Sequence, residues 1–81
     1  MLLEIVTPDK KVFEGEVKSV QMTGSQGGFE VLDNHAALIS SLGKGKVVVR
    51  SNDKQEFVID GGVAEVQNNK VIILAESLII S

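Results

Sequence analysis

The stretch Gly62–Glu76, with the sequence GVAEVQNNKVIILAE, decides the fold class of this chain. Two runs rich in valine and isoleucine flank the pair Asn68-Asn69. Asparagine tolerates a positive φ angle, and a two-residue type I′ turn needs positive φ at both central positions. The stretch therefore predicts a β-hairpin, with Gly62–Gln67 and Lys70–Glu76 as its arms.

Short strand-like runs, separated by turn residues, also occupy the rest of the chain. Many short strands at close spacing are typical of an all-β sandwich or barrel. The run Lys11–Thr23 changes its hydrophobic phase, so we expect a bulge or bend near Gly15–Ser19. The remaining expectations are strands in Leu2–Val6, Lys46–Ser51 and Gln55–Asp60, a loop in Gly24–Gly28, and a closing strand or partner-binding edge in Ser77–Ser81.

One segment, Asp33–Leu42 (DNHAALISSL), has no clear period. Asp33 or Asn34 is a suitable helix cap, and the apolar residues that follow are suitable for a short helix. The same apolar run is also compatible with a buried strand, because so short a run does not reveal its period. Both possibilities remain open from the residues alone.

Length and composition restrict what such a chain does. Residues 1–81 are enough for one small domain, and domains of this size often gain stability from disulfides, a metal or a partner. The chain has no cysteine, which excludes disulfides and thiolate metal sites, and its single histidine cannot form a zinc site of the usual kind. We expect no metal and no cofactor, and a partner remains as the third support.

Charge and hydropathy exclude further classes. The net charge is −3 and the aromatic residues are three phenylalanines, whereas nucleic-acid binders usually carry a basic patch. No apolar run approaches the roughly 20 residues of a membrane span, and the first residues lack the basic start of a signal peptide. We expect a soluble protein that binds no nucleic acid and does not insert directly into a membrane.

His35, the only histidine, is the one candidate for chemistry. Catalysis would need a nucleophile and an orienting carboxylate within hydrogen-bond reach, and Ser40, Ser41 and Asp33 are near in sequence. No nucleophile motif surrounds them. The alternatives are an imidazole that fixes a loop through backbone hydrogen bonds, or one that contacts a partner. The sequence favours these two alternatives over catalysis.

Two stretches contain sequence patterns that are more specific than the overall composition. Gly27–Val49 contains the pattern Leu-x-x-His-Ala, and Glu56–Glu76 contains Gly-Gly-x-x-Glu-Val, followed by Asn and Leu-Ala-Glu. With the opening stretch Leu3–Gly27, they resemble, in order and over nearly the whole chain, the epsilon subunit family of the rotary F-type ATP synthase, which is called delta in mitochondria. Each pattern alone is weak, and the combination is fairly specific.

The resemblance implies an all-β, two-sheet β-sandwich of about ten short strands, and it favours a strand after His35. It also implies a non-catalytic rotor subunit of the central stalk. Such a subunit binds the gamma subunit and the c-ring, and it couples proton-driven rotation to ATP synthesis. The implied location is peripheral, at the cytoplasmic face of the bacterial inner membrane.

The resemblance assigns positions one by one. It implies a c-ring-facing loop with a histidine nearby, a gamma-facing side, and a glycine turn before the penultimate strand. The c-ring-facing residues are Gln26, Gly27, Gly28, Phe29, Glu30 and His35; the gamma-facing residues are Thr7 and Ser40; and the turn residues are Gly61 and Gly62, beside the hairpin pair Asn68 and Asn69.

Several positions depart from the family pattern. Many members have an acid at position 28 and glycine at position 30, where this chain has Gly28 and Glu30. The common proline after His-Ala is Ala37 here. Long members add a C-terminal helical hairpin that inhibits ATP hydrolysis, and in some binds ATP. We expect residues 1–81 to contain neither that hairpin nor an ATP site.

Two other function classes remain as alternatives. The first is a free-standing small β-sandwich or barrel that binds a ligand or carries a cofactor. A biotin or lipoyl carrier needs a lysine at the tip of a hairpin, and Lys70 follows the Asn68-Asn69 pair instead. The second is a small hydrolase built on His35. Recovery of gamma and c subunits with this chain would separate both from the rotor hypothesis.

Overall fold

Ten β-strands follow one another along residues 1–80, the part of the chain that the computed structural model describes. These residues contain no helix long and apolar enough to cross a membrane. The ten strands confirm the expected number of short strands. The strands are β1 Leu2–Val6, β2 Lys11–Glu16, β3 Ser19–Gly24, β4 Gly27–Leu32, β5 Leu38–Leu42, β6 Gly45–Arg50, β7 Lys54–Ile59, β8 Gly62–Gln67, β9 Lys70–Ala75 and β10 Leu78–Ile80.

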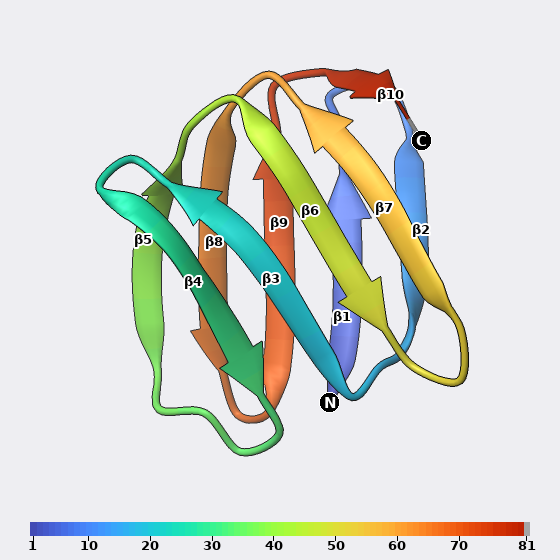
Figure 1. The fold of residues 1–81 in the computed structure, drawn as a ribbon, viewed down its shortest axis with the longest axis vertical. Helices are drawn as coiled ribbons and strands as arrows, with labels where there is room; N and C mark the ends of the chain where they lie inside the picture. Colours follow the sequence, from blue (N-terminus) through green and yellow to red (C-terminus); the bar gives the residue numbers. More distant parts are fainter. Residues whose placement is uncertain (81) are drawn as a thin grey trace.

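The strands form two stacked layers, which Figure 1 shows one behind the other. The front layer has the order β10-β7-β6-β3-β4, and the back layer has the order β5-β8-β9-β1-β2. One bridge, between Gly24 and Leu42, joins β3 to β5 at a corner. Neighbouring strands are antiparallel except β1 and β9, which are parallel. The expected β-sandwich is thus confirmed.

The core lies between the layers, and alternate residues of strands such as β1, β8 and β9 are buried in it. Leu3 and Ile5 in the back layer are fully buried, and so is Val20 in the front layer. Such alternation places one side of each strand in the core and the other in solvent. Phe13 of β2 and Phe57 of β7 meet edge to face, with ring centroids 5.9 Å apart, and connect the two layers.

Two turns depend on residues that tolerate positive φ. Asn68 and Asn69 have φ of 54° and 58°, and they connect Gln67 to its cross-strand partner Lys70. The hairpin expected from the opening stretch is therefore confirmed. Before β8, Gly62 has a φ of 152°, and a Cβ at this position would collide with the backbone oxygen of Leu74. Only glycine fits there.

Four local expectations need correction or completion. Lys11–Thr23 is not one bent strand: it breaks at Val17-Lys18, where the chain passes from the back layer to the front one. The amide of Val17 donates to the carbonyl oxygen of Met1 in the back layer, at 2.8 Å. The amide of Lys18 donates to the carbonyl oxygen of Arg50 in the front layer, also at 2.8 Å. The irregularity thus lies within the predicted range Gly15–Ser19, but it is a crossover between the two layers rather than a bulge or bend in one strand.

The expected glycine-rich loop is also shorter than predicted. Only Ser25 and Gln26 form the turn, because β3 extends to Gly24 and β4 begins at Gly27. In the ambiguous segment, Leu38–Leu42 is strand β5, as the resemblance implied, and residues 33–37 form a loop. At the C-terminal end, the expected closing strand is β10, which pairs with β7; Ser81 lies outside the described residues.

Candidate functional site

A shallow groove runs along one side of the sandwich, between strands β4 and β5. It consists of two hollows that share Phe29, Ile39 and Ser40. One hollow extends to the turn at Ser25-Gln26, and the other extends to His35. We call this surface the β4–β5 groove. Its residues are Gly24–Glu30, His35 and Leu38–Ser41.

The groove contains every predicted c-ring-facing residue, but it spreads them over its whole length. Gln26 and Gly27 lie at the turn, whereas His35 lies in the loop beyond the other end of β4. Six strand residues span roughly 20 Å. The expectation of one loop is therefore wrong, since Gly27–Glu30 belongs to a strand. His35 shares a hollow with Phe29 and Glu30, as expected, but it lies a strand's length from Gln26.

The two side chains at the middle of this set point to opposite sides of the front layer. Phe29 packs against the core, opposite Met22 of β3. Glu30 lies opposite Gln21 on the solvent face, and its carboxylate is 3.8 Å from the guanidinium of Arg50. Glu30 is therefore already oriented by a charge within the domain.

His35 does not form a catalytic arrangement. Its exposed ring has Nδ1 2.8 Å from the carbonyl oxygen of Ala36, to which a protonated Nδ1 donates. The Ser40 hydroxyl donates to the carbonyl of Ser41, at 3.2 Å, rather than to this imidazole. The loop-fixing alternative agrees with these bonds.

Thr7, the other predicted gamma-facing residue besides Ser40, is far from the groove, at the end of β1. It is only 5% exposed. Its hydroxyl donates to Asp9, at 2.7 Å, and lies 3.2 Å from the carbonyl oxygen of Lys10. The Asp9 carboxylate therefore caps a turn, and the hydrogen bond from the Thr7 hydroxyl lowers the pKa of Asp9. The Thr7 side chain stabilises that turn.

The sequence reasoning missed an apolar surface on the outer face of the back layer. Leu74 is 54% exposed and Ile39 is 73% exposed. Val63 of β8 pairs with Leu74 of β9, which pairs with Val6 of β1, so these three form one line across the sheet. Ile39 lies on the same face of the neighbouring strand. We call Val6, Ile39, Val63 and Leu74 the back-face row.

Two acidic residues lie beside this row: Glu4 is paired within the domain, whereas the exposed Glu65, directly opposite Ile39, has no ion pair among the described residues. Glu4 accepts from Lys70, at 3.1 Å, and from Lys11, at 3.3 Å. The hydrogen bond from Lys70, followed by that from Lys11, holds the pKa of Glu4 below its usual value. A partner that covers the back-face row therefore meets a neutralised Glu4, and it must supply a polar or basic group to Glu65 beside Ile39.

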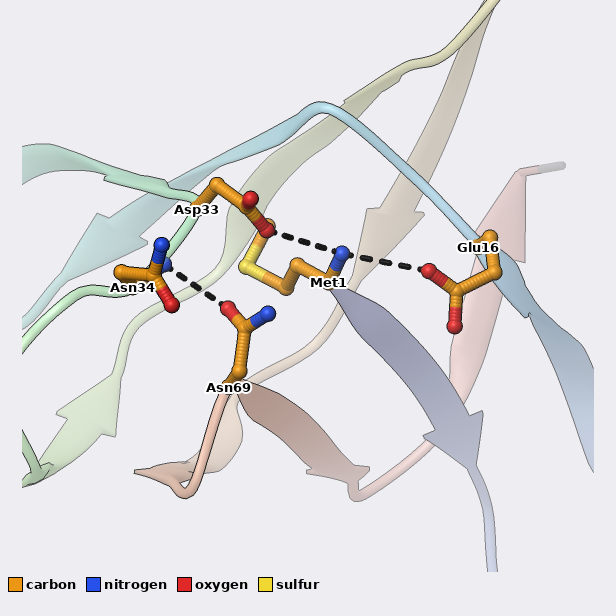
Figure 2. Close-up of polar contacts among 5 residues, drawn as sticks. All are labelled: Met1, Glu16, Asp33, Asn34 and Asn69. Atoms are coloured by element: carbon orange, nitrogen blue, oxygen red, sulfur yellow. Dashed lines mark hydrogen bonds and ion pairs between the residues drawn. The ribbon is translucent and has the colours of Figure 1, made fainter.

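The loop at the His35 end is held by polar contacts that Figure 2 shows together. The α-ammonium of Met1 lies 3.0 Å from the carboxylate of Asp33 and 3.2 Å from that of Glu16. The amide N–H of Asn34 donates to the side-chain oxygen of Asn69, at 2.8 Å. We call these five residues the N-terminal clasp. It joins the first strand, the loop and the β8–β9 turn.

The pKa values of the Met1 α-ammonium and the Asp33 carboxylate shift in opposite directions. The hydrogen bond with Asp33 is the largest cause that raises the pKa of the Met1 α-ammonium above its ordinary value of 8.0. The same bond is the largest cause that lowers the pKa of Asp33 below 3.8, and the Asn69 amide lowers it further. Both charged forms are thus favoured in the folded state.

The clasp predicts a loss of stability at mildly alkaline pH. A raised folded-state pKa contributes stability that is complete below the unfolded value and is lost as the pH rises through the folded one. The chain has no cysteine and no tyrosine, so between about pH 7.5 and pH 9.5 the α-amino group is the group that titrates. The melting temperature of a chain beginning at Met1 should fall across this window.

A matched variant tests the cause of this fall. In Asp33→Asn the carboxylate that raises the α-ammonium pKa is gone, so the fall in melting temperature across the same window should be smaller. Thermal unfolding followed by circular dichroism measures both. Equal slopes for the two chains would show that the ion pair with Asp33 contributes nothing.

Comparison with known proteins gives consistent matches over the whole chain. Residues 1–81 match the family described as ATP synthase, Delta/Epsilon chain, beta-sandwich domain. The ATP synthase epsilon chain of Maridesulfovibrio salexigens is 46% identical over 77 residues, which are 94% of this chain and 54% of that relative. The epsilon chain of Chlorobium limicola is 46% identical over 78 residues, which are 94% of this chain and 89% of that relative.

Solved structures of low sequence identity share the fold. A chain in the structure of the Tetrahymena thermophila mitochondrial ATP synthase central stalk and c-ring superposes with a TM-score of 0.84 at 19% identity, covering 98% of this chain and 65% of the other. A chain of the Euglena gracilis mitochondrial ATP synthase gives a TM-score of 0.89 at 24% identity, covering 96% and 51%. At these identities the likeness establishes a common β-sandwich.

Proposed function

Because this chain belongs to the ATP synthase delta/epsilon chain family, we propose that it is a non-catalytic rotor subunit of an F-type ATP synthase. In this role it binds the gamma subunit and the c-ring, and it couples rotation of the c-ring to ATP synthesis. The complex is membrane-associated, and we propose that this subunit lies peripherally at the cytoplasmic face of the bacterial inner membrane. The observation that carries the proposal is the match over residues 1–81.

The back-face row supports a gamma-binding surface. Thr7 follows Val6 at one end of the row, and Ser40 lies between Ile39 and Ser41 at the other. The row thus ends beside both positions assigned to gamma along the chain, although Ser40 pairs with the buried Ala64 and its side chain points away from the row. Exposed aliphatic side chains in one line are suited to an interface core, which is depleted in charge. We propose that gamma covers this row and contacts Ser40 at its edge, while Thr7 holds the turn beside it.

The β4–β5 groove supports the second contact. We propose that Gln26, Gly27 and Gly28 at the turn end, with Phe29 and Glu30 along β4, face the polar loops of the c-ring. His35 belongs to the same groove, but it lies at the far end, so it contributes at the margin of this surface. The single carboxylate of the set is Glu30, which is 44% exposed in its side chain and available to a partner.

No bond chemistry is assigned to this chain itself. The Ser40 hydroxyl donates to a backbone carbonyl, and the ring of His35 lies at hydrogen-bond distance from another, which supports structural roles for both. Within residues 1–80, no group of three or more histidine or acidic side chains is arranged to hold a metal ion. The proposed role requires binding surfaces and rigidity alone.

Co-purification tests the proposal. An affinity-tagged chain, expressed in cells that contain the other subunits, should recover gamma and c subunits after mild detergent extraction. A chain that is recovered alone under these conditions would contradict the rotor role and would favour the free-standing alternative.

A double substitution separates contact from folding in the groove. Glu30→Ala with His35→Ala removes two exposed side chains of the contact set, and Gln26 remains as its third polar side chain. We expect about a fivefold to tenfold weaker association with the rotor, since interface truncations of this kind cost roughly 1 kcal/mol. The melting temperature should fall by less than about 4 °C.

The control for this variant is Asp53→Ala, an exposed acid in the β6–β7 turn away from the groove. It should leave association unchanged. If the double variant loses folding stability and association in parallel, the two residues are structural rather than contact residues.

A further inference from the structure

The loop of residues 33–37 forms the His35 end of the β4–β5 groove. Three consecutive residues of this loop make polar contacts that fix its position. The Asp33 carboxylate pairs with the Met1 ammonium at 3.0 Å. The Asn34 amide donates to the side chain of Asn69 at 2.8 Å, and the His35 amide donates to Leu32 at 3.2 Å. The contacts with Met1 and Asn69 both cross from the loop to the back layer, and the contact with Asn69 joins residues 35 positions apart.

Asn69 has two roles that substitution separates. Its backbone, at φ 58°, belongs to the β8–β9 turn, a role that it shares with Asn68 at φ 54°. Its side chain accepts the bond from Asn34, and its amide helps to lower the pKa of Asp33. Among the described residues, the side-chain hydrogen bonds include none from Asn68. The two asparagines therefore have the same role in the β8–β9 turn, but only Asn69 contacts the loop of residues 33–37.

We infer that Asn69 is a positioning residue for rotor assembly: its side chain fixes loop 33–37, and with it His35, in the conformation that the partner binds. The inference rests on the proposed function of the groove. Asn34 itself has a φ of 63°, in the left-handed region that asparagine adopts more readily than most residues, so the Asn69 bond adds to a local preference of the loop. Without the Asn69 bond the exposed loop samples more conformations, and binding must then supply the lost backbone entropy.

The test compares Asn69→Gly with Asn68→Gly. Glycine accepts positive φ at either position, so both variants keep the turn and lose the same backbone restriction in the unfolded chain. Two quantities are measured: amide hydrogen exchange at Asn34 in the free chain, and affinity for ATP synthase from which this subunit has been stripped. Asn69→Gly also loses a native hydrogen bond, so its melting temperature should lie a few degrees below that of Asn68→Gly.

We expect Asn69→Gly to accelerate exchange at Asn34 at least tenfold and to weaken rotor binding about fivefold or more. Asn68→Gly should change neither. Faster exchange with unchanged affinity would overturn the positioning role while the rotor role remains. Unchanged exchange would show that the Asn69 side chain does not hold the loop. Failure of the unsubstituted chain to bind would overturn the proposed function itself, and the inference with it.

Discussion

Replacing Gly62 by alanine is expected to prevent the chain from folding at physiological temperature. The φ of 152° is rarely adopted by a residue with a side chain, and the added Cβ would meet the backbone oxygen of Leu74. Backbone on the paired strand β9 cannot move aside without breaking the β8–β9 ladder. Mutations of this kind cost roughly 4 kcal/mol or more, against a total stability of about 4–12 kcal/mol for a domain of this size.

Alanine substitutions at Gly27 and Gly43 show how much of the expected cost comes from backbone strain and how much from a steric collision. Gly27 has a φ of 128°, but a Cβ there would have no atom within 4 Å, so alanine should cost only about 1–2 kcal/mol. Gly43 has similar free space and no positive φ, and alanine there should be nearly neutral. Urea unfolding of the three variants checks the order. Folded, stable Gly62→Ala protein would contradict the predicted collision.

The largest predicted effect on assembly comes from the back-face row. Ile39→Glu combined with Leu74→Glu places two carboxylates in the proposed gamma interface. Each desolvated charge should cost at least about 2 kcal/mol of binding, so association should weaken by roughly 1,000-fold. Both side chains are more than half exposed, at 73% and 54%, and the isolated domain should lose little stability.

The matched control is Ile79→Glu. Ile79 is an exposed aliphatic residue, at 46%, but it belongs to β10 at the edge of the front layer. This substitution should leave gamma binding unchanged. Titration of purified gamma measures all the variants. Equal weakening by the control, or normal binding by the double variant, would mean that gamma does not cover the back-face row.

The sequence predicted the local features of the fold well, because short-range chemistry determines them. The Asn68-Asn69 pair specified a hairpin, since both residues tolerate positive φ. The segment Lys11–Thr23 was harder: Val17 and Lys18 bond to different layers, and nothing within the segment reveals those partners. The choice between a helix and a strand at Asp33–Leu42 also needed a family resemblance, because its apolar run has no readable period.

The candidate site was less predictable, because it is formed by contacts between distant residues. Ile39 and Leu74 each look like core residues in sequence, and only the strand register puts them on the outer face with Val63. The grouping of His35 with Gln26 failed because a full strand separates them. The clasp between Met1, Asp33 and Asn69 joins three distant segments, and no local pattern indicates it.

The central claim is that this chain couples the rotor, and ATP-driven proton pumping tests it most directly. Membrane vesicles carrying ATP synthase stripped of this subunit should pump poorly, and adding the purified chain should restore both its binding to the enzyme and proton pumping. The Ile39→Glu and Leu74→Glu double variant should restore neither. Vesicles that pump no better with the unsubstituted chain, while it remains unbound in solution, would contradict the rotor role.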